Sequence, residues 1–300
     1  MLDYLASPPM EPESPSPPVT DTPVAAGKID RTVQLYIGGA QVPPASGIYY
    51  KAEGLMFPLG SRKDIRNAVA AAQGAGAKWA GLGGHGRAQA LYGLAENLSL
   101  RRAELTHIAG ADEVDCAIRR CFFYAGFADK YDGAVVAEKP GHLIQVLPQP
   151  HGVMGIACPE IAPLAGLLSL ILPAIAMGNT VVVLPSRGRP LAAAVLGQVL
   201  DTSNLPGGLI NIVTGDRCAL ATALVHQDEV GAIWYAGDGG ALKAIEEGAA
   251  RTLKPVWSPA PRGWAGPGAQ GREFLRRAIW EKSVWLPYGA LPKGTGSSAY

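Results

Sequence analysis

The chain has 300 residues, of which 48% are apolar and 17% charged, so it can bury one large core or two modest ones. Its net charge of +1, with no block of basic residues, argues against nucleic acid or an anionic membrane as the main partner. The four cysteines show neither CxxC spacing nor a matching histidine pattern, which indicates reduced thiols in a cytoplasmic protein and no metal site.

The beginning of the chain is rich in proline. Residues 1–29 have few large apolar side chains, so they are predicted to form a disordered linker. They are acidic, and no basic stretch precedes an apolar one, so we expect no signal peptide. A linker here suggests that another segment was, or still is, attached upstream.

Residues 33–133 predict a hairpin followed by a helical layer. The hairpin is expected in 33–50, with Gly38-Gly39 at its turn. The sequence Ser61–Asp64 has the form of a capping box at the start of a helix. Helical spacing continues over 86–98 and 99–132, where Arg119-Arg120 is interpreted as a solvated face.

Residues 143–185 predict a strand, a second strand, a helix and a third strand. The last three are expected at Val153–Cys158, Pro163–Met177 and Thr180–Leu184, which together form a βαβ unit. No charged residue occurs from Ala162 to Leu184, so a membrane span is the alternative. Pro173 and the Gly178-Asn179 pair interrupt this run, and the interruption favours a buried helix followed by a buried strand.

After residue 185 the alternation of helix and strand is regular. Helices are expected at 191–200, 219–226 and 241–250, and strands at 209–213, 232–235 and 253–257. This order predicts an α/β fold with a doubly wound, Rossmann-like parallel sheet. A short helix at 274–280 and a strand at 283–286 are expected to follow.

The predicted domain organisation has four parts. They are the linker 1–29, a Rossmann-like domain of residues 30–133 and 151–272, a β-flap of residues 134–150 and 279–290, and a mobile tail of residues 291–300.

Four motifs in order resemble the aldehyde dehydrogenase superfamily over roughly residues 30–257. They are VMGIACPEIAPL, ILPAIAMGNTVVVLPS, LPGGLINIVTGD and AIWYAGDGGALKAI, which are similar to the family's CPWNFP, PALAAGNTVVLKPS, LPPGVVNIVTGD and IAFTGSTEVGRAI. LKPVW and a terminal VWLPYG further resemble the C-terminal, non-catalytic half of a family 16 aldehyde dehydrogenase. The resemblance implies a domain of the NAD-binding type with a small β-flap for oligomerisation and no catalytic domain.

The resemblance also implies which catalytic groups an active member needs. These are a cysteine nucleophile, an oxyanion-holding asparagine and a glutamate base. The asparagine position aligns with Ile161, which cannot donate a hydrogen bond, and residues 248–272 contain no acidic residue for the base. No cysteine occurs after Cys218, although the nucleophile belongs further on. We therefore expect that the chain is not an enzyme.

The positions that resemble the family's NAD site are degenerate. Leu184 and Arg187 stand where the family has a ribose-binding lysine and glutamate. Gly237, Asp238 and Gly239 form a weak glycine-rich turn, and Asp238 is interpreted as a helix N-cap that would repel a pyrophosphate. The expectation is no cofactor, with NAD binding as the alternative.

Three functional hypotheses follow. The first is a pseudoenzyme that serves the assembly of a two-part aldehyde dehydrogenase. It would form a homodimer through the flap and contact a catalytic domain of the same or a partner protomer, with no nucleic acid or membrane partner. Its predicted interface residues are Ile144, Val146, Val284 and Leu286. The second is an NAD-binding module of an active enzyme that oxidises aldehydes to carboxylic acids. The third is a regulatory domain that binds another ligand in the emptied cleft.

Overall fold

The computed structural model describes residues 21–23, 32–131, 133–136, 141–237, 239–260 and 262–287. The predicted tail 291–300 lies outside these residues, as does the predicted linker 1–29 apart from β1 (Asp21–Pro23). Strand β1 pairs antiparallel with β4 (Ile48–Ala52), so at these three residues the structure differs from the predicted linker.

A seven-stranded sheet forms the centre of the described chain, in the order β12-β11-β8-β9-β10-β2-β3. Its strands are β2 (Leu35–Ile37), β3 (Ala40–Val42), β8 (Val153–Ala157), β9 (Thr180–Leu184), β10 (Ile210–Ile212), β11 (Val230–Tyr235) and β12 (Val256–Trp257). Strands β8 to β12 are mutually parallel, whereas β2 runs antiparallel to β10. The predicted parallel sheet is therefore confirmed in five consecutive strands, from β12 to β10 in the sheet order, and the N-terminal hairpin makes the whole sheet mixed.

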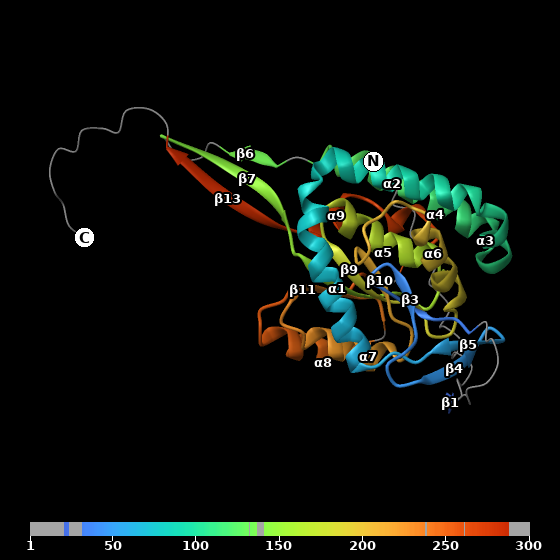
Figure 1. Ribbon diagram of the computed structural model, residues 1–300. Helices are drawn as coiled ribbons and strands as arrows, with labels where there is room; N and C mark the ends of the chain where they lie inside the picture. The colour runs from blue at the N-terminus through green and yellow to red at the C-terminus, as the bar shows by residue number, and fades with distance from the viewer. Residues whose placement is uncertain are drawn as a thin grey trace, which may run out of the picture.

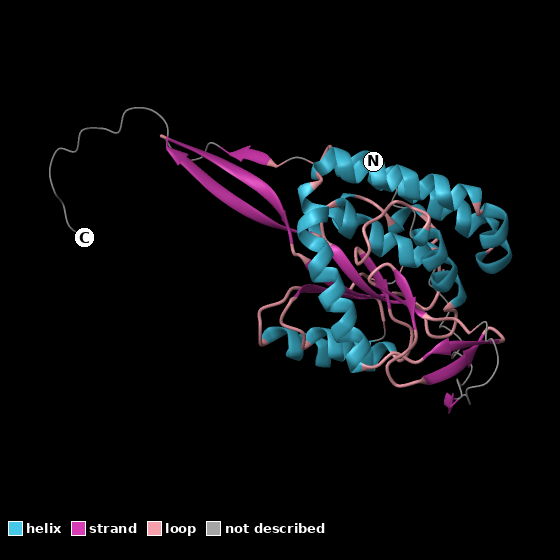
Figure 2. Ribbon diagram, in the orientation of Figure 1, coloured by secondary structure: helices cyan, strands magenta, loops and turns pink. Residues whose placement is uncertain are grey.

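Helices cover both faces of this sheet (Figures 1 and 2). One face packs against α2 (Gly83–Leu100), α3 (Arg102–Ala109), α4 (Ala111–Ala128), α5 (Ala165–Ala176), α6 (Leu191–Asp201) and α9 (Arg272–Arg277). The other face packs against α1 (Arg62–Gly81), α7 (Arg217–Val225) and α8 (Gly239–Ala250). Because α5 and α7 connect successive strands on opposite faces, the domain is doubly wound, as predicted.

Local sequence signals explain where these helices begin and end. The Ser61 hydroxyl accepts from the Asp64 amide while the Asp64 carboxylate accepts from the Ser61 amide at 2.8 Å, so the predicted capping box is present. Helix α5 ends before Gly178, whose φ of 95° needs a residue without a Cβ. The next residue, buried Asn179, donates to the carbonyls of Ala174 and Ala278 and thereby fixes the end of α5.

The apolar run after residue 162 is interior to the domain. Every residue of α5 and β9 is buried. In the part of the chain that the structure describes, no helix is both long and apolar enough to cross a membrane.

The flap is a separate three-stranded sheet that projects from the body (Figure 1). It comprises β6 (Ala134–Val136), β7 (His142–Pro150) and β13 (Ile279–Pro287), in the order β13-β7-β6. Strand β13 pairs antiparallel with β7 along all nine residues. The helix predicted at 274–280 is wrong at its end, because α9 stops at Arg277 and Ile279 already belongs to the flap.

The register of the flap separates the predicted interface residues. Ile144 lies opposite Trp285, whereas Val284 lies opposite Gln145. Because alternate residues of a strand point to opposite faces, Ile144 and Val146 are on one face and Val284 and Leu286 on the other. The four predicted interface residues are therefore divided between the two faces of the flap, and Ile144 is buried within its own chain.

Two further elements differ from the prediction. The strand expected at 253–257 is limited to β12, because Leu253 has a positive φ of 54° and its side chain is 85% exposed. A second hairpin, β4 with β5 (Leu55–Pro58), follows the predicted one and packs Tyr50 against Phe57.

The segment between β12 and β13 folds onto α4 and α5. It contains the short helix η1 (Pro267–Ala269), and its Trp264 and Ala269 side chains are buried in the main core. Arg120 of α4 holds it, donating to the carbonyl of Gly266 at 2.7 Å. Arg120 was expected on a solvated face, but it is fully buried and also contacts Ser169 at 2.6 Å.

Candidate functional site at the carboxyl edge of the sheet

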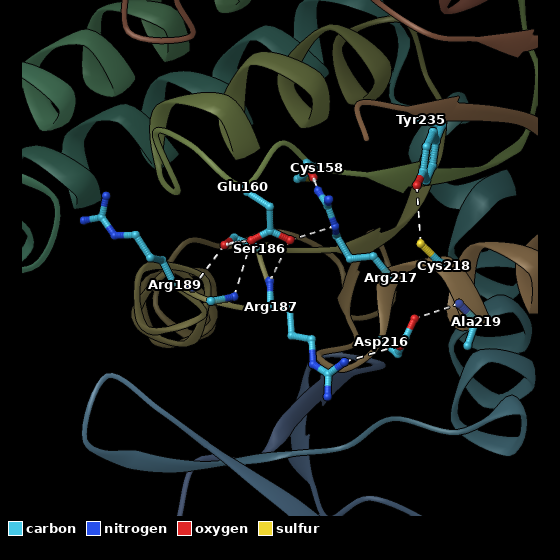
Figure 3. Close-up of polar contacts among 11 residues, drawn as sticks. Cys158, Glu160, Ser186, Arg187, Arg189, Asp216, Arg217, Cys218, Ala219 and Tyr235 are labelled. Carbon is cyan, nitrogen blue, oxygen red and sulfur yellow. Dashed lines mark hydrogen bonds and ion pairs between the residues drawn. The ribbon is translucent and has the colours of Figure 1, made fainter. Parts of the chain in front are cut away.

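The order of the strands marks one edge of the sheet as the place for a ligand. From β8 the chain adds β9 and β10 on one side and then returns to add β11 and β12 on the other. Ligands of open α/β sheets bind beyond the carboxyl ends of the strands at such a reversal. Here the reversal lies between β8 and β11, and the segments that follow β8, β9, β10 and β11 surround it (Figure 3).

Glu160 is the centre of the polar contacts at this edge. It follows β8, and its carboxylate accepts a short hydrogen bond from the Ser186 hydroxyl. The same carboxylate accepts from the backbone amides of Arg187 and Gly188, both at 3.3 Å. One carboxylate therefore connects the segments that follow β8 and β9.

Arg217 brings the segment after β10 into the same cluster. Its Nε lies 2.9 Å from the Glu160 carboxylate, and its Nη1 donates a short hydrogen bond to the Cys158 carbonyl. The two charged side chains are only 12% and 24% exposed, so this ion pair is largely removed from solvent. The Arg217 side chain therefore reaches from the start of α7 to the end of β8 (Figure 3).

Arg187 points away from this centre towards the β4–β5 hairpin. Its Nη1 pairs with Asp216 at 3.3 Å, and its guanidinium lies 5.7 Å from the centroid of the Tyr50 ring. Asp216 also caps α7 by accepting from the Ala219 amide at 3.0 Å. Burial raises the pKa of Tyr50 well above its ordinary value, so this hydroxyl stays protonated.

The structure brings only some of the predicted positions together. Ile161 follows Glu160 directly and is 38% exposed, whereas the Leu184 side chain is fully buried in the core. Gly237 precedes α8 and Gly239 begins it. Asp238 lies outside the described residues. Neither Ile161 nor Leu184 therefore supplies a polar side chain to this edge of the sheet.

Gly237 is required by close packing. A Cβ at this position would lie 2.4 Å from the ring of Tyr235, which is fully buried. The Tyr235 hydroxyl lies 3.6 Å from the Cys218 sulfur, the one exposed cysteine of the chain. Burial raises the pKa of the Cys121 and Cys158 thiols, so neither is a thiolate at neutral pH.

The charges at this edge compensate one another. Glu160 pairs with Arg217, and Asp216 with Arg187. A pyrophosphate would have to displace these carboxylates to reach either guanidinium, so the arrangement does not fit a dinucleotide as it stands. Within the described ranges no group of three or more histidine, cysteine or acidic side chains is placed to hold a metal.

Glu160, Ser186 and Arg217 were not singled out from the sequence. Glu160 stands where the family motif quoted above has a tryptophan, and a charged residue directly after a buried strand was the available signal. Arg217 had no such signal, because an arginine in the first turn of a helix is ordinarily a surface residue.

Comparison with known proteins shows similarity to one family in both sequence and fold. The family model described as "Aldehyde dehydrogenase family" matches residues 51–258. Geranial dehydrogenase of Castellaniella defragrans is 32% identical, covering 74% of this chain and 51% of that protein. Human retinaldehyde dehydrogenase 3 is 30% identical, covering 66% and 41% respectively. The crystal structure of PnpE from Pseudomonas sp. WBC-3 has a TM-score of 0.71 at 27% identity, covering 75% of this chain and 50% of PnpE.

Proposed function

The chain belongs to the aldehyde dehydrogenase family, and from this premise we propose that it is a non-catalytic member that serves the assembly of a two-part aldehyde dehydrogenase. It spans about half the length of the curated relatives it matches. In the proposal, the partner is a catalytic aldehyde dehydrogenase domain of the same or a neighbouring protomer, and the chain corresponds to the C-terminal half of a family 16 enzyme. A cytoplasmic location is part of the proposal and is supported by the free thiols of all four cysteines.

The connection between β12 and β13 supports the proposal that the chain is non-catalytic. The family's catalytic domain would follow β12, yet residues 258–278 lead directly from β12 to the flap strand β13. These residues are held in the main core by Trp264, Ala269 and the Arg120 hydrogen bond. They therefore form part of the Rossmann-like body.

The flap is the main observation in support of the proposed role in assembly. Three large apolar side chains along one of its faces are exposed, and by the register they are Val135, Leu147 and Leu286. Trp280 is on the same face at the start of β13, where its ring lies against His151. The opposite face exposes only Trp285 among the large apolar side chains of the described flap. A concentrated apolar face on a projecting sheet is typical of a surface that is buried on association.

The edge of the flap offers a second means of association. Among the described strands of the flap, β13 is an outermost strand, and it pairs with β7 along one of its two edges. Such an edge can pair with a strand of another chain through backbone hydrogen bonds. The proposed homodimer forms through this edge and the apolar face together.

The apolar face can be tested by measuring the mass of the intact chain in solution. Light scattering after size exclusion is expected to give a dimer for the unchanged chain. The double variant Leu147→Lys with Leu286→Lys is expected to be monomeric, because it places two charges on the apolar face. Ser283→Lys is the matched control, since Ser283 lies opposite Val146 on the other face of the same strand. A monomeric unchanged chain, or a dimer that survives the double variant, would contradict the proposal.

The second candidate is an NAD-binding module of an active enzyme. It is favoured by one comparison, because PnpE, which is 27% identical, has been crystallised in complex with NAD. Against it stand the buried Leu184 and the Glu160–Arg217 pair. Dinucleotide affinity distinguishes the two candidates.

A further inference from the structure

A cavity lies at the opposite, amino edge of the sheet. It has a volume of about 540 Å³ and lies between α9 and the beginning of the flap. His151, which precedes β8, and Pro255, which precedes β12, line it together with Ile279 and Trp280 of β13. None of these residues belongs to the Glu160 cluster, so the cavity is independent of the carboxyl edge.

Three arginines of α9 give this cavity its charge. Arg272, Arg276 and Arg277 line it, and Glu273 is the only acidic residue among the described residues of its lining. In the described part of the chain, none of the three guanidiniums forms an ion pair, and the Glu273 carboxylate lies 3.7 Å from Arg262 instead. The cavity therefore carries uncompensated positive charge, in contrast to the paired charges at the carboxyl edge.

Two of these guanidiniums are held in place by aromatic rings. Arg272 lies 5.8 Å from the centroid of Tyr131, and Arg277 lies 6.0 Å from that of Trp257. A guanidinium stacked on a ring keeps its N–H donors available at its edge, and this planar fork suits phosphate oxygens. Arg272 and Arg277 thus lie beside aromatic rings and keep their hydrogen-bonding capacity.

The remaining lining adds an aromatic wall. Trp280 is 49% exposed, and its ring lies edge-to-face against His151 at a centroid distance of 4.9 Å. The His151 Nε2 contacts the Arg277 carbonyl at 3.1 Å, while its Nδ1 is buried and has no partner among the described residues. His151 and Trp280 therefore form one aromatic side of the cavity.

We propose that this cavity binds a small molecule with clustered phosphate groups. The three guanidiniums hold the phosphates, and Trp280 and His151 contact the organic part. The cavity is of the size that small-molecule ligands occupy. The chain's net charge of +1 argues against an extended polyanion such as nucleic acid.

The test is calorimetric titration of the intact chain with inorganic pyrophosphate and, separately, with ADP. Saturable binding is expected for at least one of them. Arg276→Ala and Arg277→Ala are each expected to weaken it about tenfold, the effect of losing one charge-assisted hydrogen bond. Arg66→Ala is the matched control, because Arg66 is also an exposed arginine on a helix, α1, and does not line the cavity.

The two probes identify the ligand class. Tighter binding of ADP, reduced by Trp280→Ala, indicates a nucleotide, whereas equal affinity indicates recognition of the phosphates alone. All three arginines are exposed, so their removal is expected to leave the melting temperature unchanged. The proposal is overturned if neither probe binds, if Arg66→Ala weakens binding equally, or if a short oligonucleotide displaces both probes at lower concentration.

Discussion

At the carboxyl edge, a single carboxylate accepts three hydrogen bonds from one segment and forms an ion pair with another that is far from it in the sequence. Glu160 contacts Ser186, the amides of Arg187 and Gly188, and the Arg217 guanidinium. Because the ion pair is largely buried, its net contribution to the free energy of unfolding is small. Removing one partner alone is costly, because it leaves the other charge buried without a counter-ion. Glu160 and Arg217 thus fix the conformation of this edge.

Glu160→Ala is expected to lower the free energy of unfolding by about 2–4 kcal/mol, since it leaves Arg217 and two amides without their acceptor. Glu160→Gln keeps the size and one acceptor oxygen and should lose less. Urea denaturation measures both, with Glu246→Ala on the exposed side of α8 as the control. Equal stability of Glu160→Ala and the control would show that the cluster has no structural role.

His151 gives a prediction for pH. Burial lowers its pKa below the ordinary value near 6.5, so the unfolded chain binds this proton more readily than the folded chain does. Its stabilising contribution is therefore present above about pH 6.5 and is lost as the pH falls below that value. The unfolding free energy of the unchanged chain should fall more between about pH 7.5 and 5.5 than that of His151→Gln. Parallel pH profiles of the two proteins would contradict this.

Arg120 and Glu160 show the limit of sequence reasoning at this scale. The sequence places Arg120 next to Arg119 in a helix, and nothing local tells which of the two faces inward. The Gly266 carbonyl that binds Arg120 lies far along the chain, in a segment that the sequence marks only as irregular. The Glu160 contacts likewise depend on three strand ends meeting, which is a tertiary property.

At the scale of the elements, most helices and the parallel strands could be predicted. Buried β-branched runs such as Thr180–Leu184 and breakers such as Gly178 are strong local signals. Three features could not be predicted from the sequence: the flap register, the β4–β5 hairpin and the end of α9. They depend on long-range strand pairing and on side chains from other elements. The register also decides which flap residues share a face, since displacement by one residue reverses a strand's faces.

The connection from β12 to β13 packs into the main core and is held there by Arg120. Arg120→Met is expected to lower the unfolding free energy by about 2–4 kcal/mol, because the Gly266 and Ala165 carbonyls and Ser169 lose a buried donor. Arg119→Met on the adjacent, exposed position should change it by less than about 0.5 kcal/mol. If chemical denaturation gives the same small change for both, residues 258–278 are not held through Arg120.

For the whole molecule, two edges of one sheet have opposite characters. The carboxyl edge pairs its own charges, whereas the amino edge leaves three arginines uncompensated. The projecting flap adds an apolar face and an open strand edge. This distribution of charge and apolar surface is the basis for proposing a role in association.

The most direct test of this account is calorimetric titration of NAD into the intact chain carrying Arg276→Ala and Arg277→Ala, so that only the carboxyl edge is examined. Thermal melting accompanies it, because a ligand at 100 times its Kd would stabilise the fold by about 2.7 kcal/mol. We expect no saturable heat and no change in Tm up to about 1 mM NAD. A ligand with a Kd of about 1 mM has a binding free energy of only about −4 kcal/mol, so any binding missed by this titration is weaker than that. Saturable binding with a rise in Tm would contradict the account and make the chain an NAD-binding module.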